Sequence, residues 1–304
     1  RSSAASDVYK RQVSVPLNDD YSINEPEFRA YLRWIKTFYG KGMDGLVCNG
    51  HTGEITGLTR AERKRVVEIC AEECGDVMTI ISGVNCENTA ESIEMAKEAK
   101  EAGADGILLM PPHMWLRFGM NPDAPFEYVK DVAEGADIDI IIHLYPATSK
   151  AFYPVETLIK MCKEIDHVKC IKMGTRVTSI YEHDVRLLRQ ECPDISLITC
   201  HDETLCVSWF PGMDGALIGF AGCVPEIICP AREVFANPDK HTLKEAQDWS
   251  DRIYHISQAI YGGGQPSGEA HARLKEALKQ RGIFKSALMR LSLIHISEPT
   301  RLAL

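Results

Sequence analysis

The sequence predicts an α/β fold in which eight parallel strands form a (β/α)8 TIM barrel, followed by a C-terminal helical extension. Two observations carry this prediction. Short apolar runs alternate with helical stretches through residues 13–225, and three of those runs follow the same Gly-x-Asp-Gly motif. Continuous apolar runs are typical of parallel strands covered on both faces, and regular βα alternation favours a barrel over an open doubly wound sheet.

Each copy of the motif predicts the end of a helix, a tight loop and a buried strand. The copies begin at Gly42, Gly103 and Gly212, so their starts are 61 and 109 residues apart. These intervals are close to two and four βα units of about thirty residues each. A glycine just past a helix adopts the left-handed cap conformation at little steric cost, so we expect these glycines at helix ends.

The other elements follow from periodicity. Helical spacing predicts helices over residues 60–74, 154–163 and 179–190, and Asn88 with Glu91 forms a capping-box-like helix start. Apolar runs fill the gaps between helices as strands near residues 13–16 and over residues 77–81, 138–144, 168–172 and 195–200.

Four segments are expected along the chain. Residues 1–12 and 291–304 share no periodicity with their neighbours and resemble translated vector or adapter sequence, so we expect both to be non-native flanks and the native C-terminus to be cut short. Residues 13–225 are expected to form the barrel. Residues 226–290 are expected to form the C-terminal helical region, which a glycine-rich stretch at 261–268 interrupts.

Composition excludes several classes of protein. The 304 residues carry a formal charge of −9, with 45% hydrophobic and 25% charged residues, as in an ordinary globular protein. The acidic balance argues against a nucleic-acid partner, and no apolar run approaches the ~20 residues that a membrane helix needs. Eleven cysteines without a C-x-x-C pair or an export signal predict free thiols in the cytoplasm and no zinc finger.

A barrel of this kind carries its functional site at the carboxyl ends of the strands, and Lys172 ends one of the apolar runs. Strand periodicity places Val168, Cys170 and Lys172 on one face, so the lysine follows two apolar residues on the inner face. Desolvation there favours the neutral amine, which attacks a ketone and forms a Schiff base. His143 and Tyr145 share a face of the preceding strand and are expected to reach a substrate above Lys172.

Two further sets of residues end strands. The turn from Gly50 through His51 and Thr52 to Gly53 offers backbone N–H groups and a hydroxyl, which suit a carboxylate. The imidazoles of His51, His113 and His143 leave open a metal site, although their positions follow no ligand spacing.

These motifs, in this order, resemble those of the dihydrodipicolinate synthase and N-acetylneuraminate lyase family, from about residue 13 to residue 290. The resemblance implies a barrel with a C-terminal helical cap, a homo-oligomer that is a tetramer or a dimer, and a Schiff-base lyase or aldolase that needs no cofactor or metal. The matching segments are residues 15–17 with Asp20, 50–54, 145–146, 171–172, 212–215 and 272–275.

Carried over residue by residue, the resemblance implies that Lys172 forms an imine with the keto carbon of pyruvate or another 2-keto acid. His143 stands where the family has the tyrosine that relays protons above the imine, and Tyr145 lies two residues on. His113 stands where the synthase has a relay tyrosine that a neighbouring subunit donates. Thr148 stands where the synthase has an arginine that holds the carboxylate of its aldehyde substrate.

The resemblance also implies that Gly50, His51, Thr52 and Gly53 cradle the carboxylate of the keto acid. We therefore expect a lyase or aldolase for pyruvate or for a 2-keto acid of the 2-keto-3-deoxy sugar acid type. Alternatives within the family are 4-hydroxy-tetrahydrodipicolinate synthesis itself and a 2-keto acid hydratase or dehydratase. Alternatives of other classes are a metal-dependent barrel lyase or hydrolase that uses the three histidines, and a non-catalytic protein that binds 2-keto acids.

Overall fold

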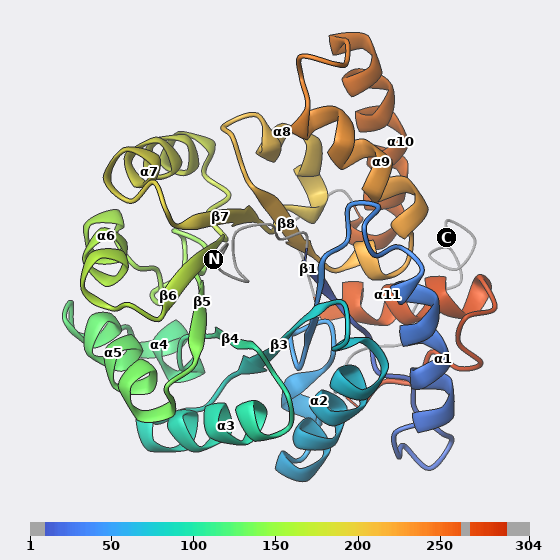
Figure 1. The fold of residues 1–304 in the computed structure, drawn as a ribbon, viewed down its shortest axis with the longest axis horizontal. Helices are drawn as coiled ribbons and strands as arrows, with labels where there is room; N and C mark the ends of the chain where they lie inside the picture. Colours follow the sequence, from blue (N-terminus) through green and yellow to red (C-terminus); the bar gives the residue numbers. More distant parts are fainter. Residues whose placement is uncertain (1–9, 263–267, 291–304) are drawn as a thin grey trace.

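The computed structural model describes residues 10–262 and 268–290, and in it eight parallel strands form one closed barrel surrounded by helices (Figure 1). The strands pair in chain order, and β1 closes the barrel by pairing with β8. The architecture is therefore the α/β fold that the sequence predicts. The strands are β1 Lys10–Gln12, β2 Gly45–Cys48, β3 Thr79–Val84, β4 Gly106–Leu109, β5 Asp139–His143, β6 Val168–Met173, β7 Ser196–Thr199 and β8 Gly215–Ile218.

Helices follow most strands and cover the outside of the barrel. The α-helices are α1 Glu25–Lys36, α2 Arg60–Cys74, α3 Thr89–Glu101, α4 His113–Phe118, α5 Ala124–Ala136, α6 Val155–Glu164, α7 Thr178–Glu191, α8 Leu205–Trp209, α9 Pro225–Ala236, α10 Leu243–Tyr261 and α11 Gly268–Gln280. Three short 3-10 turns are η1 Ile55–Gly57, η2 Asp202–Thr204 and η3 Phe220–Gly222.

The first strand differs from its predicted position. It lies at Lys10–Gln12, within the segment assigned to a flank, and not at residues 13–16. Backbone pairing with β2 and β8 forms this strand, although its sequence, Lys-Arg-Gln, has no apolar run. The next residue, Val13, continues the ladder by donating to the Val47 carbonyl at 3.0 Å. Within the described residues, the barrel therefore begins at residue 10.

Two of the three motif glycines lie at helix ends, and all three adopt the expected backbone. Gly103 and Gly212 follow the last residues of α3 and α8 by two and three positions, whereas Gly42 lies six residues after α1. Gly42, Gly103 and Gly212 have φ of +97°, +101° and +90°. Glycine adopts positive φ without the steric penalty that a Cβ atom imposes on other residues. The Asn88 side chain accepts from the Glu91 backbone N–H at 2.8 Å, which caps α3. The Glu91 carboxylate accepts from Nδ2 of Asn88 at 3.4 Å and not from the Asn88 backbone N–H, so the predicted helix start is confirmed but the reciprocal bond of a capping box is not formed.

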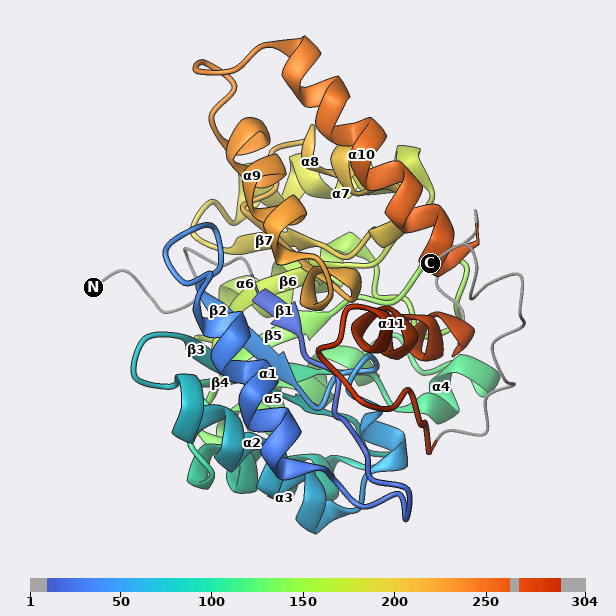
Figure 2. The same cartoon turned by 90° about the vertical axis from the view of Figure 1, so that its right-hand side faces the viewer.

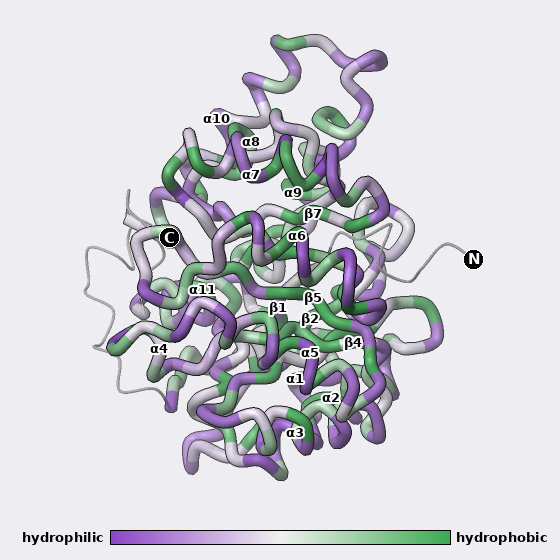
Figure 3. Tube along the Cα trace, turned by 90° about the vertical axis from the view of Figure 1, so that its left-hand side faces the viewer, coloured by the Kyte–Doolittle hydropathy of each residue, from purple (hydrophilic) through white to green (hydrophobic). Residues whose placement is uncertain are grey.

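Two apolar layers hold the barrel together. A large cluster packs between the strands and the surrounding helices, and hydrophobic segments run through the strands while outer helices carry hydrophilic segments (Figure 3). A second cluster fills the interior, and its members come from seven different strands: Val47, Ile81, Leu108, Ile141, Cys170, Ile198 and Leu217. Cys170 therefore faces the barrel interior, as the alternation along β6 predicts.

The C-terminal helices lie on two sides of the barrel. α10 rises beside α8 and α9, whereas α11 lies in front of the barrel near α1 (Figure 2). A hydrogen bond of 3.0 Å from Arg273 to the Ile260 carbonyl joins α11 to the end of α10. Among the described residues, no helix is both long and apolar enough to cross a bilayer.

Candidate active site

A cavity of about 330 Å³ opens at the carboxyl ends of the strands and contains Lys172. It brings together six of the predicted site residues, from four different βα loops and strand ends. The residues that line it are Gln12, His51, Thr52, His113, Leu116, His143, Tyr145, Pro146, Lys172, Arg176, Cys200, Asp202, Gly219, Tyr261, Gly268 and His271.

Lys172 lies near the end of β6, directly beside His143 on β5 in the strand register. Its side chain follows the interior residue Cys170 on the same face of the strand, and only 4% of Lys172 is exposed. Burial lowers the pKa of Lys172, and the electrostatic interactions of Lys172 with Cys200 and Asp202 oppose this effect only in part. Burial therefore shifts the protonation equilibrium of Lys172 toward the neutral amine.

His51, His143 and Tyr145 form a compact group beside Lys172. The Tyr145 hydroxyl lies 3.2 Å from Nε2 of His51, and the His143 and Tyr145 rings meet edge to face with centroids 4.9 Å apart. Burial lowers the pKa of His51 to about 3 and that of His143 well below its usual value, and the positive charge of Lys172 adds to both effects. Burial also raises the pKa of Tyr145. All three groups are therefore neutral near neutral pH.

The predicted carboxylate cradle is a turn closed by its own backbone. Gly53 donates to the Gly50 carbonyl at 3.1 Å. Thr52 is buried, lines the cavity, and donates its backbone N–H to Oε1 of Gln12 at 3.2 Å. A Cβ at position 50 would lie 2.6 Å from that Gln12 oxygen, and one at position 53 would lie 3.0 Å from the Val13 carbonyl. The two glycines shape the turn without lining the cavity themselves.

Thr148 is exposed and does not line the cavity, so the structure does not place it with the other predicted residues. The cation in the cavity comes from Arg176, four residues after Lys172. Arg176 donates to Glu203 at 2.8 Å and to the carbonyls of Gly174 and Cys200 at 2.8 and 3.1 Å. These contacts hold the Arg176 guanidinium in one position in the lining of the cavity.

Sequence reasoning missed several lining residues. Asp202 accepts from the Tyr261 hydroxyl at 2.7 Å and from the Gly219 N–H at 2.7 Å, and burial raises the pKa of its carboxyl to about 6. Asp202 follows the end of β7, so the strand-end rule that found Lys172 could also have found it. Tyr261 and His271 come from helices outside the barrel, and Gln12 from the excluded flank, so that rule could not find them.

The three-histidine metal alternative lacks support from the geometry. The His51 and His113 rings lie parallel with centroids 6.2 Å apart, and those of His51 and His143 are 5.5 Å apart. Within residues 10–262 and 268–290, no three His, Cys, Asp or Glu side chains form a group placed to hold a metal ion. The described residues therefore do not form the metal centre that was left open.

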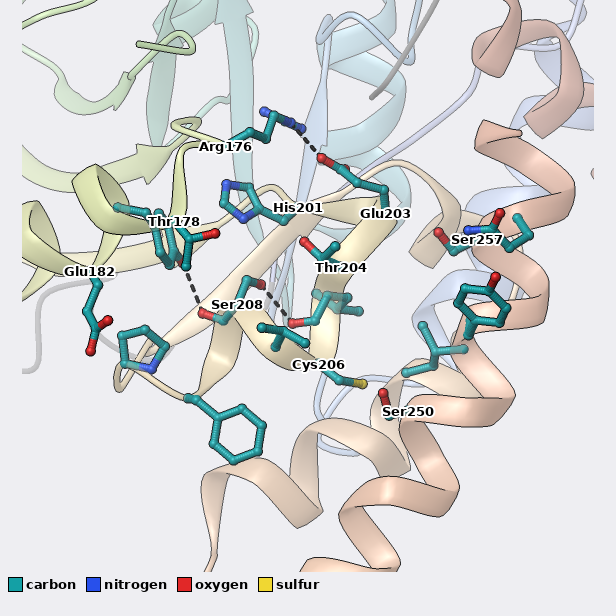
Figure 4. A pocket seen from close by; sticks show the side chains of 18 of the residues that line it. Arg176, Thr178, Glu182, His201, Glu203, Thr204, Cys206, Ser208, Ser250 and Ser257 are labelled. Carbon is teal, nitrogen blue, oxygen red and sulfur yellow. Dashed lines mark hydrogen bonds and ion pairs between the residues drawn. The ribbon is translucent and has the colours of Figure 1, made fainter. Parts of the chain in front are cut away.

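A second, larger cavity of about 810 Å³ lies between α7, α8 and α10 (Figure 4). It shares Arg176 with the first cavity, and along the end of β7 the residues alternate between the two. Cys200 and Asp202 line the first cavity, whereas His201 and Glu203 line the second. The second cavity holds none of the predicted site residues, so the amine chemistry belongs to the smaller one.

Known proteins resemble this chain along nearly its whole length. The dihydrodipicolinate synthetase family matches residues 11–304. The 4-hydroxy-tetrahydrodipicolinate synthase of Bartonella bacilliformis is 26% identical over 288 residues, which cover 94% of this chain and 91% of that protein. An uncharacterized DapA-like lyase of Thermofilum pendens is also 26% identical, over 232 residues that cover 76% of this chain and 74% of that protein.

Solved structures show the same fold. The N-acetylneuraminate lyase of Fusobacterium nucleatum superposes with a TM-score of 0.81 at 20% identity and covers 98% of this chain and 96% of its own. A prophage protein from E. coli K12, of the dihydrodipicolinic acid synthase family and in complex with pyruvate, gives a TM-score of 0.84 at 19% identity, with coverage of 97% and 94%. Because the family matches all but the first ten residues, the chain belongs to the dihydrodipicolinate synthetase family and is a lyase.

Proposed function

We propose that this lyase forms a Schiff base between Lys172 and a 2-keto acid and then makes or breaks a bond in the bound substrate. The observation that carries the proposal is a lysine with 4% exposure whose pKa burial lowers, at the end of a barrel strand in a cavity with neutral proton-transfer groups. A neutral amine in a dry site is the reactive form for attack on a ketone.

The proposed first step joins Nζ of Lys172 to the keto carbon. The nitrogen loses a proton and the keto oxygen gains one, and a second proton on that oxygen lets it leave as water. The hydrogen-bonded pair of Tyr145 and His51, together with His143, lies beside Lys172 and can carry these transfers. Because these groups are neutral, the imidazoles can accept a proton and the phenol can donate one.

The iminium that results draws electrons from the neighbouring carbon. When a bond at the substrate breaks, its electron pair moves toward the iminium and gives an enamine, and protonation followed by attack of water releases the keto acid and the free amine. The lysine thereby supplies the electron sink, so we propose that the reaction needs no cofactor. Condensation is the same sequence in reverse.

The carboxylate of the keto acid is proposed to bind at the turn that contains His51 and Thr52. In the structure the Thr52 N–H donates to Gln12, so a carboxylate at this N–H must take the place of the Gln12 oxygen. Thr52 also lines the cavity, and its hydroxyl offers a second donor.

For the substrate we propose the 2-keto-3-deoxy sugar acid type. The threonine at position 148 is neutral and exposed, which does not suit the carboxylated aldehyde of the synthase. Arg176 and Asp202 supply polar groups for a hydroxylated chain. A cytoplasmic homo-oligomer, either a tetramer or a dimer, remains our prediction for the assembled enzyme.

The proposal is tested by borohydride reduction in the presence of pyruvate, followed by mass spectrometry of the peptides. We expect a pyruvyl-sized adduct on Lys172, and we expect Lys172→Ala to lose both the adduct and turnover while the fold is kept. The matched control is Lys169→Ala, on the other face of β6, which should keep the adduct. If pyruvate and a panel of 2-keto acids leave Lys172 unmodified, the Schiff-base mechanism is wrong for this chain.

A further inference from the structure

His271 lies in the catalytic cavity although its helix, α11, is not part of the barrel. Its Nδ1 atom is buried and has no hydrogen-bond partner among the described residues. Burial lowers the pKa of His271, and the nearby carboxylate of Glu54 opposes this effect. The ring is therefore neutral and retains one N–H to donate. Nothing in the barrel mechanism above uses this imidazole.

A buried ion pair fixes the part of α11 that carries His271. Lys275 follows His271 by one helical turn, is 1% exposed, and pairs with the 3% exposed Glu54. Lys275 also donates to the Leu288 carbonyl at 2.8 Å, and the Glu54 carboxylate accepts the Arg290 backbone N–H at 2.9 Å. Helix α11 is thus held by groups that water does not reach, which limits its movement relative to Glu54.

The same glutamate ends the carboxylate turn. Glu54 has a left-handed backbone, with φ of +56°, and its N–H donates to the His51 carbonyl at 2.9 Å. The ion pair therefore joins the turn that carries His51 and Thr52 to the helix that carries His271. This connection fixes two walls of one cavity relative to each other.

The packing around Gly219 places α11 beside Thr52. A Cβ at position 219 would lie 3.1 Å from the Thr52 hydroxyl oxygen, 3.1 Å from a Leu274 methyl and 2.9 Å from the Tyr261 hydroxyl. Leu274 is on α11, three residues after His271, so the helix approaches the cavity beside the carboxylate turn.

We propose that His271 is a substrate-binding residue that donates a hydrogen bond to the carboxylate of the 2-keto acid, and that the ion pair of Glu54 and Lys275 positions it. The inference rests on the proposed function, because it assigns a partner to the carboxylate of the same substrate. A carboxylate that leaves water for this cavity needs several donors, and the Thr52 N–H is shared with Gln12. His271 supplies a donor that needs no rearrangement.

The test measures the concentration of ketone that half-saturates adduct formation on Lys172. It compares pyruvate with acetone, in which a methyl group replaces the carboxylate. We expect His271→Ala and His271→Leu to raise the half-saturating pyruvate about tenfold or more, because a hydrogen bond to a charged group is lost. Acetone should show no such change. His271→Asn, which keeps a donor, should recover part of the affinity for pyruvate.

The matched control is His255→Ala, an exposed histidine on α10, which should behave as the wild type with both ketones. If His271→Ala fails to fold, His271→Leu fills the same space and carries the test. An unchanged half-saturation for pyruvate in the folded variant overturns this inference alone, and so does an equal loss with acetone. If the wild type forms no adduct with any ketone, the proposed function falls and this inference falls with it.

Discussion

The reactivity proposed for Lys172 depends on the position at which β6 ends. Two apolar residues precede Lys172 on the inner face of β6. Its amine therefore lies at the boundary between the packed barrel interior and the cavity. The ammonium ion loses its hydration there, and no carboxylate of the described residues lies at hydrogen-bond distance to replace it. Burial thus has the largest effect on its pKa, and the direction of that effect is downward.

This direction gives a prediction for pH. The neutral amine is the attacking form, so the rate of adduct formation should rise with pH and level off above the pKa of Lys172. Because burial lowers that pKa, the midpoint should lie below the ordinary lysine value of 10.5. The measurement is the rate of trapped adduct from neutral to alkaline pH, with ketone in excess. A midpoint at or above the ordinary value would contradict the burial argument.

At this scale the sequence predicts some site residues and misses others for a physical reason. Lys172 and His143 sit on strands whose period of two fixes the face of each side chain, and their strands place them side by side. Tyr145 follows β5 by two residues, and its ring packs against that of His143. Thr148 lies in a loop after the strand, where no period fixes the direction of a side chain, and it is exposed and does not line the cavity. His271 depends on how α11 docks, which no local pattern in the sequence encodes.

At the scale of the element, the ends of β5 and β6 meet so closely that only glycine fits at position 174. A Cβ on Gly174 would lie 2.0 Å from the Leu144 carbonyl oxygen, a distance at which the backbone must move. We expect Gly174→Ala to lower the free energy of unfolding by about 3 kcal/mol or more through this overlap, and to displace the neighbouring Lys172. Urea denaturation measures the stability, and pyruvate trapping measures the displacement.

Gly212→Ala is the matched control for this prediction. Nothing lies within 4 Å of a Cβ at position 212, so the substitution meets only the strain of its left-handed backbone, with φ of +90°. That strain costs about 1–2 kcal/mol. Gly174 has no left-handed backbone, so its substitution should cost more than that of Gly212 only through the overlap with the Leu144 carbonyl. An equal loss of stability in the two variants would contradict this overlap argument.

Most elements could be predicted because each carries its own signal. The apolar runs, the glycine caps and the capping box are local, and the strands and helices that they predict are present. β1 is the exception, because Lys10–Gln12 becomes a strand through pairing with β2 and β8 on its two sides. Neighbours that are distant in the sequence impose the strand conformation on this polar tripeptide. Its own residues therefore give no indication of a strand.

At the scale of the whole molecule, the segment after α11 ties the end of the described chain to its beginning. Arg290 makes two contacts of 2.6 Å with the Glu62 carboxylate, and the Lys285 N–H donates to Glu27 at 2.7 Å. Lys275 pairs with Glu54 across the same boundary. The resemblance at residues 272–275 marks this helix but does not give its partner, because the contact joins segments far apart in the sequence.

The buried pair gives the last prediction. Lys275→Met should lower the free energy of unfolding by about 3–5 kcal/mol, because it leaves the Glu54 charge buried without its cation. The double variant with Glu54→Gln should recover part of that loss, since it removes the orphaned charge as well. Lys163→Met, which breaks the half-exposed pair with Glu191, should cost less than about 1 kcal/mol. Urea denaturation of the four proteins, wild type included, tests the argument. If Lys275→Met costs no more than Lys163→Met, burial does not make the Glu54 pair special, and α11 must be held by its apolar contacts.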